Sequence, residues 1–318
     1  MIDQYGRAIT YLRLSVTELC NLRCRYCMPE NGICKKSHEE MLTEEEMIRV
    51  VRAAASLGIR KLRITGGEPL VKKNILSICA KAAEVPGIEE LCITTNGVLL
   101  PQMASGLRKA GVCRVNISLD TLRTDRYAYI TRIGRLEQAL EGLRCAVETG
   151  FDKIKINAVL IGGFNDDEIT DLAALTSAYP VDVRFIELMP MYDGGDFGPE
   201  AYLPGSTVLK AIPELEELAP RDDGVARLYQ LPGAKGTVGL INPLSAHFCH
   251  TCNRIRVTAD GKVKPCLHSR DEFSLKGLDE EGMTNVLKQT ILNKPQWHGE
   301  LSSESRSHAG RNMNQIGG

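Results

Sequence analysis

The sequence predicts an α/β fold, in which an incomplete (β/α)6 barrel of the TIM type is followed by a C-terminal α+β extension. Two observations support this prediction. Between residues 8 and 189, short β-rich runs alternate with longer amphipathic runs, which is the pattern of consecutive βα units and a parallel sheet. After Met189 the chain becomes dense in Gly and Pro, and only short β-like pieces follow. We therefore expect a barrel part over residues 1–190 and an extension over residues 191–318.

The barrel part contains six expected strands. They cover residues 9–16, 61–65, 91–95, 114–119, 154–160 and 183–189. The segments between them are long enough for helices. Six units are too few to close an eight-stranded barrel, so we expect an open barrel whose active site lies at the C-terminal ends of the strands.

Capping and glycine signals mark the expected helices. Thr43 followed by Glu46 forms a capping box, and the apolar stripe that follows should end near Gly58. Gly134 and Gly150 bracket the helix before the fifth strand. In the extension we expect short strands at 228–231 and 237–242, a Cys-rich hairpin, and a helix around 278–291.

Composition limits the functional classes. The chain has 318 residues, and its 39 Lys and Arg against 40 Asp and Glu give a net charge of −1. This balance removes the broad electrostatic attraction on which bulk nucleic-acid or membrane-surface binding depends. The sequence contains no run of 18 apolar residues, so it predicts no membrane-spanning helix. We also see no secretory leader, and we therefore expect a cytoplasmic protein. Eleven cysteines in a reducing compartment indicate metal or redox chemistry for those that cluster.

The first cysteine cluster follows the first expected strand. Cys20, Cys24 and Cys27 form a CxxxCxxC pattern. Three thiolates in one short loop can hold three irons of a [4Fe-4S] cube, whereas such clusters usually have four Cys ligands. The fourth iron would then be open to a small molecule. The alternative is a zinc knuckle with a fourth ligand elsewhere, for which CxxC spacing is more usual.

The second expected strand runs into the motif Gly-Gly-Glu-Pro at residues 66–69. Glycines at a strand end let the backbone approach a ligand closely, and an acidic side chain beside them could hold an ammonium group. Together, CxxxCxxC and GGEP resemble the signature of the radical S-adenosylmethionine (SAM) superfamily. The resemblance implies that SAM chelates the open iron and is cleaved reductively to a 5′-deoxyadenosyl radical. The residues that it assigns to SAM are Tyr26, Gly66, Gly67, Glu68, Ser118 and Met189.

A second cysteine cluster lies in the extension. Cys249 and Cys252 form a CxxC pair, and Cys266 follows after thirteen residues. The intervening segment looks like a β-hairpin turned at Asp260 and Gly261, which would bring Cys266 back beside the pair. One interpretation is a zinc ribbon completed by His247, His250 or His268, and the other is a second iron–sulfur cluster.

The residues near the second cysteine cluster indicate that this part of the chain binds a nucleotide. Arg254 and Arg256 alternate on one face of the expected hairpin, and Arg is suited to clamp phosphates through paired N–H donors. Here the sequence resembles the GTP 3′,8-cyclase (MoaA) family of molybdenum cofactor biosynthesis, over essentially the whole chain. The resemblance implies a second [4Fe-4S] cluster whose open iron binds the guanine of GTP. It also implies a catalytic role for Gly317 and Gly318 at the end of the chain.

The same resemblance assigns a set of residues to GTP. They are Arg13, Lys61, Arg63, Thr94, Lys155, Arg184, Arg254 and Arg256. Arg13, Arg63, Lys155 and Arg184 lie on parallel strands that such folds normally bury. We therefore expect these four cations to line one cationic cavity near the strand ends. A triphosphate is the natural counter-ion.

The resemblance further implies the reaction and its partners. The radical abstracts H3′ from the ribose of GTP, and C3′ then adds to guanine C8 to give (8S)-3′,8-cyclo-7,8-dihydroguanosine 5′-triphosphate. An external one-electron donor and a downstream cyclic pyranopterin monophosphate synthase are implied, and a homodimer is compatible with the resemblance. No nucleic-acid or membrane partner is expected.

Two alternative functions remain open at this point. A radical SAM peptide maturase with an auxiliary cluster would need no buried run of cations. A zinc-stabilised nucleic-acid or protein-binding module would contain no iron.

Five cysteines stand apart from both clusters. Cys79, Cys92, Cys113 and Cys145 lie in apolar helical or strand patterns, so we expect small buried side chains. Cys34 lies in a loop and receives no role.

Overall fold

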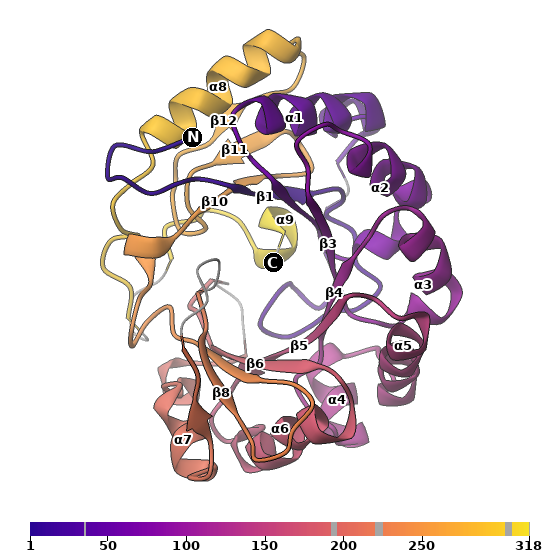
Figure 1. Cartoon of the computed structure of the whole chain (residues 1–318), viewed down its shortest axis with the longest axis vertical. Helices are drawn as coiled ribbons and strands as arrows, with labels where there is room; N and C mark the ends of the chain where they lie inside the picture. The colour runs from indigo at the N-terminus through magenta and orange to yellow at the C-terminus, as the bar shows by residue number, and fades with distance from the viewer. Residues whose placement is uncertain (35, 192–195, 220–224, 303–306, 318) are drawn as a thin grey trace.

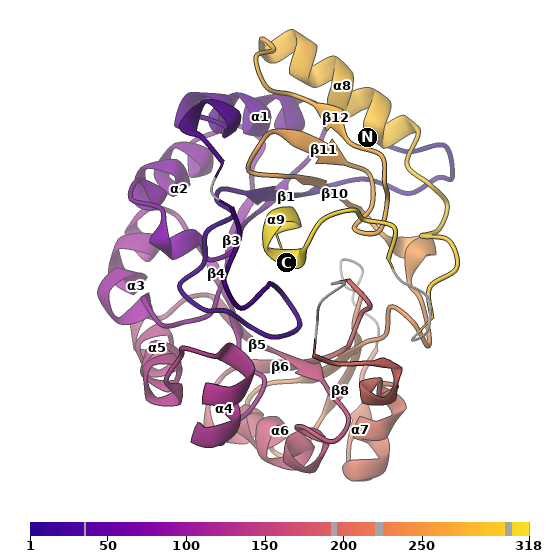
Figure 2. The same ribbon diagram turned by 180° about the vertical axis from the view of Figure 1, so that it is seen from behind.

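The computed structural model describes residues 1–34, 36–191, 196–219, 225–302 and 307–317. Its strands form one curved sheet, and most of its helices lie on the outside of that sheet (Figure 1). The strand order is β12-β11-β10-β1-β2-β3-β4-β5-β6-β9-β8-β7. The centre of the curve contains the end of the chain, which Figure 2 shows from behind.

The six strands of the barrel part are confirmed, each within two residues of the expected bounds. They are β1 (Tyr11–Ser15), β2 (Lys61–Thr65), β3 (Glu90–Thr95), β4 (Arg114–Ser118), β5 (Lys153–Leu160) and β6 (Asp182–Glu187). Each pairs in parallel with the next, as expected for consecutive βα units. The result is a mixed α/β architecture with a parallel sheet, consistent with an incomplete barrel.

The strands of the extension continue this same sheet at both of its edges. β10 (Arg254–Val257) pairs in parallel with β1, and β9 (Val238–Ile241) pairs in parallel with β6. The remaining strands add antiparallel partners outside these two: β11 (Lys262–Lys264), β12 (Phe273–Ser274), β8 (Arg227–Gln230) and β7 (Glu216–Glu217). The expected hairpin over β10 and β11 is confirmed, and Gly261 adopts a positive φ of 77° in its turn.

The α-helices are α1 (Glu44–Ser56), α2 (Ile75–Ala83), α3 (Leu100–Lys109), α4 (Thr124–Thr131), α5 (Leu136–Thr149), α6 (Ile169–Ala178), α7 (Ser206–Ala211), α8 (Glu280–Leu292) and α9 (Met313–Ile316). The capping box of α1 is confirmed, because the Glu46 backbone N–H donates to Thr43 Oγ1 at 3.2 Å. At the end of α5, Gly150 adopts the left-handed conformation.

Apolar and polar side chains alternate along the strands, so the apolar ones face the helices and the polar ones face the interior of the barrel. In β5, Ile154, Ile156 and Ala158 are buried against the helices, whereas Lys153 and Lys155 are half-buried on the inner side. The helix layer packs closely at Gly142 of α5, where a Cβ would lie 2.0 Å from the Gly97 carbonyl oxygen. The sheet therefore presents an apolar outer face and a polar inner face.

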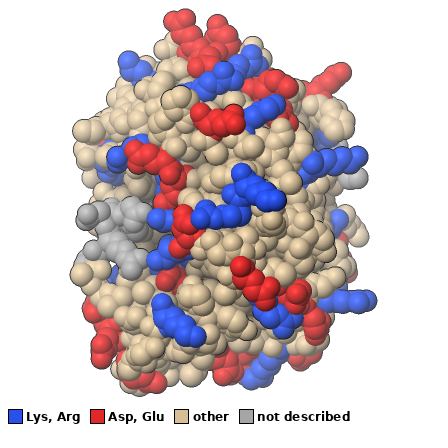
Figure 3. Space-filling view, turned by 45° about the vertical axis from the view of Figure 1, so that its right-hand side comes forward, with Lys and Arg blue, Asp and Glu red and all other residues tan. Residues whose placement is uncertain are grey.

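The surface carries both charge signs. In Figure 3, Lys and Arg side chains are interspersed with Asp and Glu over the visible face. Among the described residues, no helix is both long enough and apolar enough to cross a membrane.

Candidate active site

A cavity of about 400 Å³ occupies the interior of the barrel, between β1, β2, β4, β5, β6 and β10. Its lining contains ten Lys and Arg side chains and, among the described residues, no Asp or Glu. These cations are Arg13, Lys61, Arg63, Arg114, Lys153, Lys155, Arg184, Arg254, Arg256 and Lys294. The cavity is therefore built to accept an anion.

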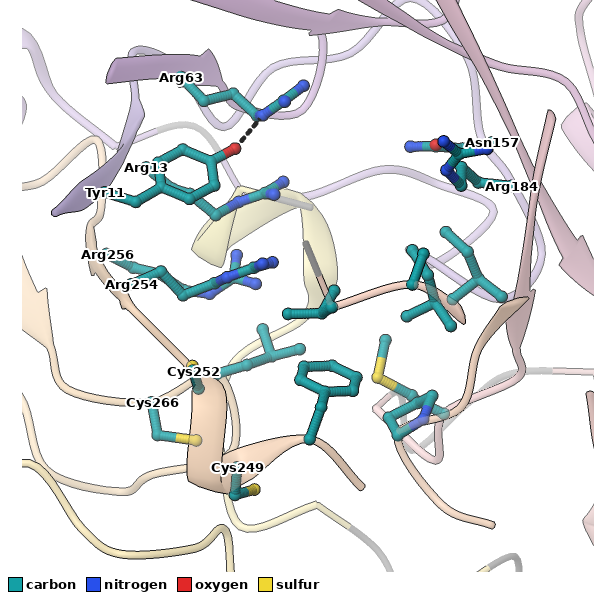
Figure 4. A pocket seen from close by; sticks show the side chains of 18 of the residues that line it. Tyr11, Arg13, Arg63, Asn157, Arg184, Cys249, Cys252, Arg254, Arg256 and Cys266 are labelled. Carbon is teal, nitrogen blue, oxygen red and sulfur yellow. Dashed lines mark hydrogen bonds between the residues drawn. The ribbon is translucent and has the colours of Figure 1, made fainter. Parts of the chain in front are cut away.

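One wall of the cavity is a row of arginines set by strand register. Arg13 of β1 pairs with Arg256 of β10 on one side and with Arg63 of β2 on the other. Figure 4 shows these guanidinium groups together with Arg254 beside Tyr11. The Tyr11 hydroxyl accepts a hydrogen bond from Arg63 Nε, and its ring centroid lies 5.2 Å from the Arg254 guanidinium carbon. The expected cationic cavity is present, but the cations Arg13, Arg63, Lys155 and Arg184 lie inside their strands rather than near the strand ends.

The opposite wall carries Lys155, Asn157 and Arg184. Asn157 of β5 is in register with Arg184 of β6, and both face the arginine row in Figure 4. Arg184 is held by its neighbours, since its guanidinium donates to the Thr237 carbonyl at 3.1 Å and to Asp182 Oδ2 at 3.0 Å. It therefore adds a fixed positive charge to this wall.

The crowding of cations shifts their protonation equilibria. Burial and the nearby Arg254 lower the pKa of Arg256 to about 10. Burial, with Arg184 as the next cause, lowers the pKa of Lys155 to about 7. Both shifts have the sign expected for buried cations that lie among like charges.

The three cysteines of the extension lie at one end of the cavity, on the same lining as the arginine row. The hairpin of β10 and β11 brings Cys266 beside the turn that carries Cys249 and Cys252. Burial would raise the pKa of Cys252, but Lys294 and Arg254 outweigh burial and lower it. Burial raises the pKa of Cys249. These cations therefore shift Cys252 toward the thiolate form that a metal ligand requires.

The cysteines of the first cluster lie in a tight loop after β1. The backbone N–H of Cys27 donates to the Cys24 carbonyl at 2.9 Å, and the Leu22 N–H donates to Cys20 Sγ at 3.3 Å. Burial raises the pKa of Cys20 to about 11 and that of Cys27 to about 12, so both are neutral thiols in the metal-free protein. Three soft sulfur donors in one loop are a donor set that suits iron.

Neither cysteine set is arranged as a preformed site for one metal ion. Among the described parts of the chain, no three His, Cys, Asp or Glu side chains are placed to hold such an ion. His250 is exposed, and the buried His268 is engaged through Nδ1 with Ser307 Oγ at 2.8 Å.

The GGEP loop packs directly on the loop that carries Cys20. A Cβ at Gly66 would lie 2.5 Å from the Thr17 carbonyl oxygen, and one at Gly67 would lie 2.6 Å from the Glu18 carbonyl oxygen. Both positions therefore require glycine for this close approach.

The carboxylate of Glu68 has its partners within the protein. Oε1 accepts from the Leu70 N–H at 3.0 Å and from Thr95 Oγ1 at 2.8 Å, and Oε2 accepts from the Asn96 N–H at 2.7 Å. Burial raises the pKa of Glu68 to about 7. The carboxylate thus fastens the end of β3, and its expected contact with an ammonium group stays a prediction.

Of the other residues expected to contact SAM, Tyr26 lies in the first cysteine loop, whereas Ser118 and Met189 lie at or just after strand ends. The Tyr26 hydroxyl donates to Asp120 Oδ2 at 2.7 Å, which ties the loop to the segment after β4. Ser118 is the last residue of β4, and Met189 follows β6 and lines the cavity. Thr94 does not line the cavity but receives a hydrogen bond from Arg63 Nη1 at 3.3 Å.

The C-terminal tail enters the barrel. Ile316 is fully buried, and the Gly317 carbonyl accepts a hydrogen bond from Arg256 Nη1 at 2.7 Å. A Cβ at Gly317 would lie 2.4 Å from Thr65 Oγ1, and its φ is 82°. The tail therefore lines the cavity at Met313 and contacts the cavity residue Arg256 at Gly317, and Gly318 lies outside the described residues.

Several site residues were not predicted from the sequence. Asn116 and Asn157 line the cavity at inward positions of β4 and β5, where the alternation of polar and apolar residues was a usable signal. Arg132, at a positive φ of 64°, donates to the Arg23 carbonyl at 2.8 Å and braces the first cysteine loop, and no local pattern marks it. Two isolated cysteines also differ from expectation, because Cys113 and Cys145 are only half-buried.

Comparison with known proteins identifies the family. The radical SAM superfamily model matches residues 14–176, and the model described as Molybdenum Cofactor Synthesis C matches residues 181–300. The GTP 3′,8-cyclases of Alkaliphilus oremlandii and Peptoclostridium acidaminophilum are each 48% identical to this chain. Both alignments cover all of this chain, with 100% and 98% of the respective relatives. The chain belongs to the radical SAM GTP 3′,8-cyclase family.

The GTP 3′,8-cyclase of Moorella thermoacetica is 44% identical, again over the full length of both proteins. Among solved structures, Streptococcus suis SuiB bound to S-adenosylmethionine superposes with a TM-score of 0.68 at 16% identity, covering 92% of this chain and 68% of that one. At that identity the likeness shows the fold alone. Within this family, a [4Fe-4S] cluster and SAM are the implied cofactors.

Proposed function

We propose that this chain binds GTP in the cationic cavity and converts it to (8S)-3′,8-cyclo-7,8-dihydroguanosine 5′-triphosphate, using SAM and two [4Fe-4S] clusters in the cytoplasm. The observation that carries the proposal is the cavity, which joins an acid-free lining of ten cations to the second cysteine set. A triphosphate would bring negative charge to this group of cations, and a guanine would supply a nitrogen ligand for an open iron.

The proposed roles follow the two ends of the cavity. Arg13, Lys61 and Arg63 would hold phosphates from one wall, with Arg254 and Arg256 beside them. The remaining members of the proposed substrate set are Thr94, Lys155 and Arg184. Cys249, Cys252 and Cys266 would hold the second cluster at the base-binding end, where Lys294 and Arg254 favour thiolate.

The proposed SAM site lies at the first cysteine loop. Cys20, Cys24 and Cys27 would hold the first cluster, with Tyr26, Gly66, Gly67, Glu68, Ser118 and Met189 around SAM. When bound there, SAM would supply a 5′-deoxyadenosyl radical, which takes H3′ from the ribose and becomes 5′-deoxyadenosine. C3′ would then join guanine C8, and the resulting radical would take up one electron from the external donor and one proton. The enclosing barrel wall keeps water and other hydrogen donors away from that chemistry.

The division of the chain follows these roles. Residues 1–190 would bind SAM, and residues 191–318 would supply the second cluster and the tail. Gly317 and Gly318 are proposed to act in catalysis, which the bond from Arg256 to the Gly317 carbonyl supports. Deletion of these two glycines tests the role, because unaltered GTP turnover would exclude it.

The proposed partners are an external one-electron donor and a cyclic pyranopterin monophosphate synthase that accepts the product. A homodimer remains part of the proposal, and no nucleic-acid or membrane partner is included.

The alternatives are disfavoured by the same observations. A peptide maturase needs no cavity lined by ten cations, and the 48% identity over the full chain is with GTP 3′,8-cyclases. The family match likewise removes the zinc-binding module.

The decisive experiment is anaerobic incubation of the reconstituted protein with SAM, a reductant and GTP. Formation of 5′-deoxyadenosine together with a cyclised product of the same mass as GTP supports the proposal. Formation of 5′-deoxyadenosine with untouched GTP retains the radical SAM chemistry and excludes GTP as the substrate.

A further inference from the structure

Two of the isolated cysteines meet between the neighbouring strands β3 and β4 (Figure 1). Cys92 lies within β3, and Cys113 directly precedes β4. Their side chains are hydrogen-bonded to each other. Cys92 is fully buried, whereas Cys113 is half-buried. The pair lies toward the N-terminal ends of its strands and belongs to neither cysteine set, so its chemistry is separate from that of the two proposed clusters.

The backbone places the two cysteines at a separation that suits a disulfide. Cys92 is in register with Arg114, so Cys113 is offset from Cys92 by one residue along the neighbouring strand. Neighbouring strands lie about 4.8 Å apart and one residue rises about 3.3 Å, which puts the two Cα atoms about 6 Å apart. Disulfides bridge Cα separations of about 4.4 to 6.8 Å. A bond between the two sulfurs therefore requires no movement of either strand.

The two thiols differ in acidity. Their mutual hydrogen bond is the largest cause that lowers the pKa of Cys113 to about 6. The same bond, together with burial, raises the pKa of Cys92 well above its ordinary value. Cys113 is thus a half-exposed thiolate at neutral pH, and Cys92 is a buried thiol beside it. This is the arrangement of an attacking cysteine and a resolving cysteine.

The pair lies directly behind the wall of the cationic cavity. The Cys92 thiol donates a hydrogen bond to Glu90 Oε1 at 2.9 Å. The Glu90 carboxylate is also ion-paired with two cavity cations, Lys61 at 2.5 Å and Arg114 at 2.9 Å. Cys92 therefore has polar surroundings, unlike a cysteine that only fills space in an apolar core.

We propose that Cys92 and Cys113 are a reversible redox pair that closes to a disulfide when it reacts with a low-molecular-weight disulfide. The Cys113 thiolate attacks one sulfur of the small disulfide, displaces one thiolate and forms a mixed disulfide. The Cys92 sulfur then attacks the Cys113 sulfur and displaces the second thiolate, and the Cys92 proton passes to a displaced thiolate. Two protein thiols are oxidised to one disulfide, and the small disulfide is reduced to two thiols.

The test uses the reconstituted holoenzyme and bis(2-hydroxyethyl) disulfide at neutral pH under anaerobic conditions. Remaining thiols are then blocked with iodoacetamide, and the protein is digested with trypsin for mass spectrometry. Cys92 lies in tryptic peptide 82–108 and Cys113 in peptide 110–114, and neither peptide contains another cysteine. We expect the two peptides to be joined, and dithiothreitol to separate them. Cys145, also half-buried, is the internal control and should not join to either peptide.

Two single variants assign the roles. Cys92→Ser should lose the joined peptides and retain the small thiol on Cys113, because no second thiol resolves the mixed disulfide. Cys113→Ser should leave Cys92 as a free thiol, because Cys92 is fully buried. Absence of the joined peptides from the folded wild type would overturn the proposal. Joining of Cys145 to either peptide in equal amount would also overturn it, because random exchange would then explain the product.

Discussion

Lys155 is the cavity cation whose charge should change when a triphosphate binds. Its pKa is lowered to about 7, first by burial and next by Arg184. A bound triphosphate supplies negative charge and returns the pKa toward the ordinary value of about 10.4. Binding of GTP should therefore be coupled to uptake of a proton by this side chain.

The size of the effect follows from the lowered pKa. In the free protein, Lys155 is deprotonated in about 0.1 of molecules at pH 6, about 0.5 at pH 7 and about 0.9 at pH 8. Those fractions are the protons that Lys155 takes up per GTP bound. Because the neutral form must first be protonated, the part of GTP affinity due to Lys155 should fall about fivefold between pH 7 and pH 8.

Titration calorimetry in two buffers of different ionisation enthalpy measures the uptake directly. Lys155→Arg is the comparison, since Arg stays charged throughout this range, and the phosphate protons of GTP contribute equally to both proteins. Lys153→Arg is the control, because Lys153 is ion-paired with Asp182 at 3.0 Å. Equal proton uptake at pH 8 by the wild type and Lys155→Arg would refute the reasoning.

Three further predictions concern the tail, the core and the second cysteine set. Arg256→Lys removes the donor to the Gly317 carbonyl, and we expect GTP turnover to fall about tenfold while 5′-deoxyadenosine still forms in the chromatographic assay. Gly142→Ala places a Cβ 2.0 Å from the Gly97 carbonyl, so the free energy of unfolding in urea should fall by about 3 kcal/mol. Cys266→Ala should retain SAM cleavage but lose GTP conversion, with about four fewer irons per chain.

Each of these predictions has a contrary outcome. Undiminished turnover in Arg256→Lys would mean that the tail is placed by other contacts. For the core, Gly150→Ala is the control, because its φ is 71° but nothing lies within 4 Å, and it should cost only about 1 kcal/mol. A smaller loss for Gly142→Ala than for Gly150→Ala would contradict the packing argument. Intact GTP conversion by Cys266→Ala would refute the assignment of the second cluster.

Local periodicity was sufficient to predict the strands and several of the cavity residues. The alternation in β5 marks Lys155 as an inward cation, and the capping box and glycine signals locate α1 and α5. These features are encoded within a few residues of one another, so a single sequence displays them.

Contacts between distant segments could not be predicted in the same way. The pairing of β10 with β1 joins residues about 240 positions apart, and nothing in either strand specifies its neighbour. The contacts of Glu68 could not be predicted either, because its partner Thr95 ends the next strand, β3, and its partner Asn96 follows that strand. Lys294 reaches the cavity from beyond α8, and no motif surrounds it.

The pairing of β10 and β9 with the two outer strands of the barrel part has a consequence for folding. Before residues 238–257 are in place, β1 and β6 are edge strands that expose unpaired N–H and C=O groups along parallel ladders. A growing chain that ends near residue 190 therefore exposes two unpaired strand edges, and such edges promote aggregation. Synthesis of the extension caps both edges, so the segment that completes the cavity also protects the barrel from aggregation.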